Sequence, residues 1–135
     1  MDDTIKYLSL YRLERAKEDL KAAVVSYENG LYKAALNRSY YAIFHAIRAV
    51  NAIQMFDSKR HSGVIAYFNK MFVHTGYFDK EDYKIITSAY RLREKSDYED
   101  FYVVTREDAE IQIKNAKIFI AKVEKFLNEC FKVEN

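Results

Sequence analysis

An arginine and a histidine, Arg38 and His45, are the residues of this chain most suited to chemistry. They stand seven positions apart in the segment Asn-Arg-Ser-Tyr-Tyr-Ala-Ile-Phe-His at residues 37–45. In a helix, seven residues fall only about 20° short of two full turns, so both side chains leave one face. Arginine is a permanent cation, and histidine exchanges a proton near neutral pH. One helix face would therefore carry a fixed positive charge and a proton-transfer group.

Helix geometry limits how this pair can act. Seven residues rise about 10 Å along the axis. Helical side chains lean toward the N-terminus, so Arg38 is expected to point away from His45. The two could flank one extended substrate, or meet the same pair of a second chain across a two-fold axis. Alternatively, both are structural: Arg38 pairs with an acid such as Asp97, and His45 makes a core hydrogen bond.

Other chemistries find little support in the sequence. The three histidines, His45, His61 and His74, are scattered without metal-binding spacing, so no metal site is predicted. There is no glycine-rich phosphate loop or other cofactor motif. The single cysteine, Cys130, is interpreted as a free structural thiol in a reducing compartment. With neither a signal peptide nor a membrane-length apolar run, the sequence predicts a cytoplasmic protein without membrane contact.

Composition indicates an all-α protein. The chain has 135 residues, no proline and only three glycines, so turn-rich sheet folds are disfavoured. Its length suits one domain, residues 1–135, built as an up-and-down bundle of about five helices. The net charge of +2 is too small to indicate nucleic-acid binding by itself.

Hydrophobic spacing and cap residues locate the helices. The candidate N-terminal caps are Thr4, Asp57 or Ser58, Asp79, and Thr105 with Asp108. Residues 96–104 are predicted to be a loop, although 102–104 resemble a short strand. In the last helix, Ile111 is expected on the core face. The predicted helices cover residues 5–29, 31–54, 62–72, 80–96 and 106–131.

The second predicted helix, residues 31–54, is apolar around most of its circumference and should lie centrally. Its polar side is expected to hold Lys33, Asn37, Arg48 and Asn51. Beside an apolar stripe runs a row of small residues that would let another helix approach closely, from this chain or from a second one. This alanine stripe comprises Ala35, Ala42, Ala46 and Ala49.

Three motifs give the chain a family resemblance. They are Ala-Leu-Asn-Arg-Ser-Tyr-Tyr-Ala-Ile-Phe-His-Ala at 35–46, His-Ser-Gly-Val-Ile-Ala-Tyr-Phe at 61–68 and Leu-Arg-Glu-Lys-Ser-Asp-Tyr at 92–98. In this order, across residues 8–128, they resemble the HEPN domain superfamily, and most closely its small stand-alone prokaryotic branch, formerly an uncharacterised protein family. The resemblance implies an up-and-down helical bundle, which agrees with the composition.

The resemblance also implies a function in outline. Many HEPN domains are metal-independent endoribonucleases, often toxins paired with a small nucleotidyltransferase antitoxin. Their signature is an arginine followed four to six residues later by a histidine, and six residues separate Arg38 from His45. Asn37 precedes the arginine and Ser39 follows it. One subgroup carries a tyrosine two positions after the histidine that the partner adenylates, where this chain has Ile47.

Two hypotheses follow from the resemblance. In the first, a homodimeric endoribonuclease uses His45 as general acid or base and Arg38 to hold the scissile phosphate. Asp97 would fix Arg93 or Arg38. In the second, the same face binds a nucleotide or a partner nucleotidyltransferase without catalysis. The residues expected to contact RNA or orient such contacts are Asn37, Tyr41, Arg93, Asp97 and Tyr98.

Overall fold

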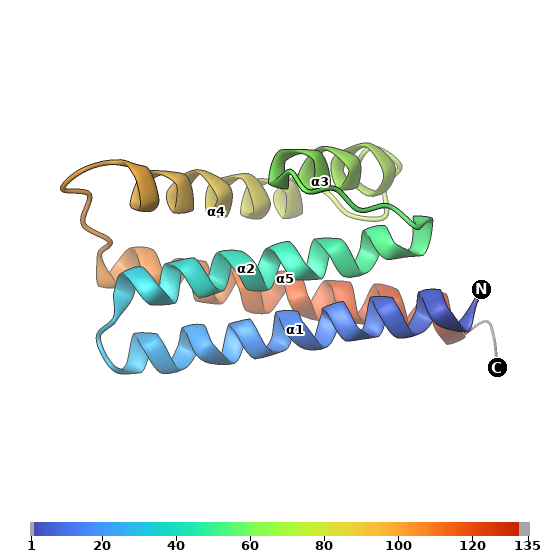
Figure 1. Cartoon of the computed structure of the whole chain (residues 1–135), viewed down its shortest axis with the longest axis horizontal. Helices are drawn as coiled ribbons and strands as arrows, with labels where there is room; N and C mark the ends of the chain where they lie inside the picture. The colour runs from blue at the N-terminus through green and yellow to red at the C-terminus, as the bar shows by residue number, and fades with distance from the viewer. Residues whose placement is uncertain (1, 133–135) are drawn as a thin grey trace.

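The structure, a computed structural model, describes residues 2–132. Five α-helices running up and down form most of this part of the chain (Figure 1). The all-α prediction is confirmed. A 3₁₀ turn, η1, extends α2, and a single π-helical turn, η2, extends α3. The elements are α1 (Asp3–Glu28), α2 (Tyr32–Asn51), η1 (Ala52–Gln54), α3 (His61–Phe68), η2 (Asn69–Val73), α4 (Lys80–Tyr98) and α5 (Arg106–Lys132).

Helix α2 is the central element, as its apolar circumference predicts. It packs against α1 and α5 on one side and against α3 and α4 on the other. Figure 1 shows α3 and α4 lying along the side of α2 that faces away from α1. A side chain on α2 can therefore meet partners from several other helices.

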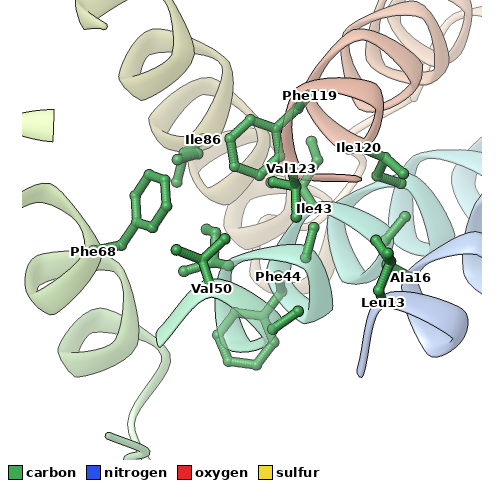
Figure 2. Packing of buried hydrophobic residues seen from close by; sticks show 14 of the residues in the cluster. Leu13, Ala16, Ile43, Phe44, Val50, Phe68, Ile86, Phe119, Ile120 and Val123 are labelled. Carbon is green, nitrogen blue, oxygen red and sulfur yellow. The ribbon is translucent and has the colours of Figure 1, made fainter. Parts of the chain in front are cut away.

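All the helices contribute to one apolar core. Its large side chains come from α2 to α5, whereas α1 contributes small and medium ones near the middle of α2 (Figure 2). Burial of this surface supplies most of the stability of such a bundle. The residues labelled in Figure 2 are Leu13, Ala16, Ile43, Phe44, Val50, Phe68, Ile86, Phe119, Ile120 and Val123.

The alanine stripe of α2 is buried against another helix of the same chain. All four of its alanines are fully buried, and they face small residues of α1 such as Ala16 and Ala23. The Ser9 hydroxyl donates a hydrogen bond of 2.7 Å to the Ala49 carbonyl, which shows how closely the two helices approach. The stripe is thus the intrachain contact with α1, and a second chain cannot use it without unfolding the bundle.

Two of the predicted caps are confirmed. Asp79 accepts from the Asp82 backbone at 3.0 Å, and Asp82 accepts from the Asp79 backbone at 2.9 Å, so α4 begins with a reciprocal capping box. Thr105 and Asp108 make the same exchange at α5. These pairs lie three residues apart, which explains why the sequence alone reveals them. Helix α4 continues to Tyr98, two residues beyond its predicted end, and residues 99–105 form turns and irregular backbone without the short strand considered at 102–104.

Two predicted caps are wrong. Helix α1 is capped by Asp2, whose carboxylate accepts from the Thr4 backbone at 2.7 Å, so Thr4 is inside the helix. Helix α3 begins at His61 after Arg60, with no side-chain cap. Asp57 and Ser58 accept instead from the backbone amides of Ser58 and Arg60, which precede the helix, and Asp57 also binds arginines of α1 and α2.

Two predictions of which side chains face the core or the solvent are also wrong. Asn51 is buried, and its amide donates to the Val64 carbonyl at 3.1 Å, joining α2 to α3. Ile111 is 55% exposed, and Gln112 takes the inward position beside it. Adjacent helical positions differ by about 100°, so these two side chains lie on different faces of α5. Within residues 2–132, none of the helices combines the length and the apolar character needed to traverse a lipid bilayer.

Candidate functional site

Arg38 and His45 meet at a carboxylate from α1. The Arg38 Nη1 atom donates to Asp19 Oδ1 at 3.1 Å, and the His45 Nε2 atom lies 3.6 Å from Asp19 Oδ2. The two oxygens of one carboxylate therefore bridge the pair. The expectation that the two side chains diverge along α2 is wrong.

The bridge forms because the Arg38 side chain runs toward the C-terminus of α2. Its guanidinium carbon lies 5.0 Å from the centre of the Tyr41 ring, in a cation–π contact. Asp19 reaches the pair from between Ala16 and Ala23, the small residues through which α1 packs on α2. That spacing of three and four residues is the signal that could have identified Asp19 as inward-facing.

His45 is only 7% exposed and has a charged group beside each ring nitrogen. Arg48 Nη1 lies 3.4 Å from His45 Nδ1. Because an arginine can only donate, Nδ1 is the accepting nitrogen, and the proton of the neutral ring lies on Nε2, toward Asp19. The positions of Arg48 and Asp19 on either side of the ring thus determine the tautomer.

The His45 ring is neutral at pH 7. Burial, reinforced by nearby arginines, lowers the pKa of His45 from 6.5 to about 4, so the ordinary value assumed from the sequence does not apply. Burial also raises the pKa of Asp19, although Arg38 opposes this shift. The site thus presents a neutral imidazole whose basic nitrogen is Nδ1. The arginines concerned are Arg15, Arg48, Arg38 and Arg12.

A second carboxylate, Asp57, holds Arg48 in place. Arg48 donates to its two oxygens from Nε at 3.3 Å and from Nη2 at 2.9 Å. The buried Arg12 also donates to Asp57, at 3.2 Å. The hydrogen bond from Arg48 is the main reason that the pKa of Asp57 lies below its ordinary value. With one edge of its guanidinium fixed, Arg48 keeps Nη1 directed at His45.

An aromatic cluster adjoins this site. His61, the first residue of α3, stacks on Phe44 with ring centres 4.1 Å apart, and its Nδ1 lies 2.7 Å from the Tyr40 hydroxyl. Arg93 of α4 lies over the rings of Tyr40 and Tyr41, at 5.2 and 5.6 Å. Sequence reasoning missed His61 as a site residue. Its position in the second motif was the only available signal.

The predicted substrate-contacting residues divide into two groups. Asn37 accepts from Arg38 Nη2 at 2.9 Å, and Tyr41 lies between Arg38 and Arg93. Asp97 binds Arg93 at 3.0 Å, which is one of its two predicted partners, whereas Arg38 pairs with Asp19. Tyr98 is 73% exposed at the end of α4, and the structure does not bring it into the contacts above.

An open groove of about 720 Å³ lies beside Arg38. Asn37, Arg38 and Asp97 form part of its wall, together with apolar residues from the α1–α2 turn such as Leu31 and Tyr32. A flexible anionic chain could approach Arg38 along this groove. Residues 2–132 contain no group of three or more His, Cys, Asp or Glu side chains arranged to hold a metal ion.

Comparisons with known proteins agree with the motifs. A model of the HEPN domain family matches residues 9–126. A Methanocaldococcus jannaschii protein named "Putative toxin" is 41% identical over 117 residues, which cover 87% of this chain and 87% of that protein. A second protein of the same name and organism is 32% identical over 115 residues, covering 85% and 78%. A UPF0332 protein of Thermotoga maritima is 31% identical over 129 residues, covering 96% and 97%.

Proposed function

The chain belongs to the HEPN domain family, and from this premise we propose that it is a toxin-type endoribonuclease that cuts RNA without a metal ion. The names of the two Methanocaldococcus relatives support the toxin part of the proposal. The chemistry of Arg38, His45 and Asp19 supports the ribonuclease activity.

The observation that carries the proposal is the meeting of Arg38 and His45 at one carboxylate. A guanidinium and an imidazole that can both reach one small anion can both reach one phosphodiester. Arg38 is the more accessible of the two, with its side chain 40% exposed beside the groove. RNA would enter along the groove and bring its phosphate to Arg38.

In the proposed reaction, the 2′-hydroxyl of the substrate is the nucleophile. The substrate hydroxyl takes the place of Arg48 Nη1 at His45 Nδ1. His45 Nδ1 accepts the proton of that hydroxyl as its oxygen attacks phosphorus, and Arg38 stabilises the charge that develops on the phosphate oxygens. Asp19 is a positioning residue, because its carboxylate faces His45 Nε2 at 3.6 Å and so favours the tautomer with the lone pair on Nδ1. The bond from phosphorus to the 5′ oxygen then breaks, leaving a cyclic 2′,3′-phosphate.

RNA must compete with carboxylates of the protein for the arginines of the site. Arg38 is paired with Asp19, Arg48 with Asp57, and Arg93 with Asp97. A phosphate that binds any of these arginines displaces or shares its carboxylate. We therefore expect weak binding, with a salt dependence set by the few phosphates that these arginines contact.

A non-catalytic binding module is the second candidate. The burial of His45, with both ring nitrogens already facing Asp19 and Arg48, favours it. In this reading the exposed Arg38, Asn37 and Asp97 bind a nucleotide or a nucleotidyltransferase at the groove. The internal contacts of His45 would then serve stability alone.

We also propose a homodimer whose interface lies away from the alanine stripe. Since the alanine stripe is buried, a second chain would use the end of the bundle where the α1–α2 turn and the α4–α5 loop lie together (Figure 1). Exposed apolar side chains occur in this region, including Leu31, Tyr98 and Phe101. Light scattering of the purified protein measures the dimer directly.

The decisive experiment incubates the purified protein with single-stranded RNA in EDTA. We expect cleavage to cyclic phosphate ends, lost in Arg38→Ala and His45→Ala and retained in His74→Ala, a matched histidine outside the site. Full activity of His45→Ala would refute the assigned base. Mononucleotide binding without any RNA cleavage would favour the binding module. Growth arrest on expression, relieved by His45→Ala, tests the toxin role.

A further inference from the structure

Breaking the bond to the 5′ oxygen requires a proton for that oxygen, and His45 is already occupied with the 2′-hydroxyl. We propose that His61 is the general acid that supplies it, a second catalytic histidine contributed by α3. This inference rests on the proposed RNA cleavage. The His61 ring is held by aromatic neighbours, has one open nitrogen and lies on the same aromatic cluster as His45.

Three aromatic side chains fix the plane of the His61 ring. Phe44 stacks on it with ring centres 4.1 Å apart, and Tyr40 lies nearly parallel at 5.7 Å. Tyr41 meets it edge-on at 5.8 Å, with an interplanar angle of 89°. Catalytic groups require this kind of orientation before substrate binds.

The Tyr40 hydroxyl fixes which nitrogen is available. It lies 2.7 Å from His61 Nδ1, and Tyr40 itself is buried. Burial raises the pKa of Tyr40 above its ordinary value, so the hydroxyl keeps its proton. It can accept from Nδ1–H when the ring is charged and donate to Nδ1 when the ring is neutral. Tyr40 therefore serves as a partner on both sides of a proton transfer.

The other nitrogen, Nε2, is open. It has no hydrogen-bond partner within residues 2–132, yet it is not among the buried unpaired atoms, so solvent reaches it. His45 differs in this respect, because charged groups face both of its nitrogens. Of the two rings, His61 is the one that can meet a substrate oxygen without displacing a protein group.

The two histidines are close enough to act on one phosphate. The Phe44 ring centre lies 5.9 Å from that of His45 and 4.1 Å from that of His61, so the imidazole centres are at most about 10 Å apart. This upper limit allows both rings to hydrogen-bond to one phosphodiester. Arg93, over the neighbouring tyrosines, supplies a second positive charge beside it.

The proposed step balances without a co-reactant. The 2′ oxygen forms a bond to phosphorus and loses its proton to His45 Nδ1. Burial, reinforced by Arg93, lowers the pKa of His61, so the charged ring is a minor form at pH 7 that gives up its proton readily. The bond between phosphorus and the 5′ oxygen breaks, and that oxygen takes the proton from Nε2 of this charged His61 ring. The products are a cyclic phosphate, a 5′-hydroxyl, protonated His45 and neutral His61, after which a proton exchange with water restores the enzyme.

The test uses an RNA whose scissile 5′ oxygen is replaced by sulfur, because a thiolate leaves without being protonated. We expect His61→Ala to cut ordinary RNA about 100-fold or more slowly than wild type, and to cut the sulfur-containing RNA at a rate close to wild type. His45→Ala should be slow on both, since the base is needed in either case. His74→Ala should match wild type on both.

Two results would overturn the assignment to His61: wild-type cleavage of ordinary RNA by His61→Ala, or an equal loss on both substrates in a variant that unfolds at the wild-type temperature. Should His61→Ala lose its fold, Tyr40→Phe provides the same comparison, because it removes the hydroxyl and keeps the ring. It should slow only the cutting of ordinary RNA. Cleavage of neither RNA by the wild-type protein would overturn the proposed function and this inference together.

Discussion

Replacing Asp19 by asparagine tests the shared carboxylate most directly. Asparagine has nearly the same shape but only one accepting oxygen. If that oxygen continues to accept from Arg38 Nη1, the amide nitrogen faces His45 Nε2, where two donors would oppose each other. The Nε2 proton then loses its acceptor, while Arg48 opposes a proton on Nδ1, so the tautomer on which the proposed mechanism depends is no longer favoured.

The expected magnitudes differ sharply between stability and activity. The Arg38–Asp19 pair is partly open to solvent, with side chains 40% and 17% exposed, and such pairs contribute about 0–1 kcal/mol. The raised pKa of Asp19 means that its charged form is less favourable in the folded protein than in the unfolded chain. The free energy of unfolding should change by about 1 kcal/mol or less, whereas cleavage should fall about 100-fold, the usual contribution of a general base.

The assay compares Asp19→Asn with Glu18→Gln, which neutralises the exposed neighbouring acid of α1. Initial rates on a fluorogenic RNA in EDTA are measured beside thermal unfolding. Retained activity in Asp19→Asn would show that Asp19 positions nothing. A rise in activity would show that the carboxylate masks Arg38 from phosphate. A large loss of stability would refute the energetic reasoning.

Three further predictions concern the surroundings of the site. Because the pKa of His45 is about 4 in the folded protein and about 6.5 in the unfolded chain, only the unfolded chain gains this proton as pH falls from 6.5 to 4. This difference should remove about 3 kcal/mol of stability over that window, and NMR should show a neutral His45 ring above pH 5. Ala46→Leu should destabilise the monomer by about 1–3 kcal/mol in urea unfolding, because α1 already contacts the stripe; dissociation of a dimer without loss of stability would contradict this. Asp57→Ala should cost about 1–3 kcal/mol by leaving buried Arg12 without its carboxylate, and Asp57→Asn should cost less, again measured in urea.

The sequence by itself determined the fold class, the central place of α2 and the starts of α4 and α5. These features depend on residues one to four positions apart, so hydrophobic spacing and capping pairs such as Asp79 with Asp82 express them directly. The motifs also identified the family, since they are stretches of contiguous sequence. Arg38 and His45 could be selected as candidates because both lie on one such stretch.

Only the tertiary structure decided what these candidates touch. Asp19 is 19 positions from Arg38, and His61 is 21 positions from Tyr40, so each contact depends on how two helices pack. That packing brought Asp19 between the pair, turned Arg38 toward His45, and buried the alanine stripe against α1. It also lowered the pKa of His45, because burial and the nearby arginines become effective only once the bundle has formed. Spacing along the chain assigns a side chain to a helix face, and the packing of helices determines its partners and its charge.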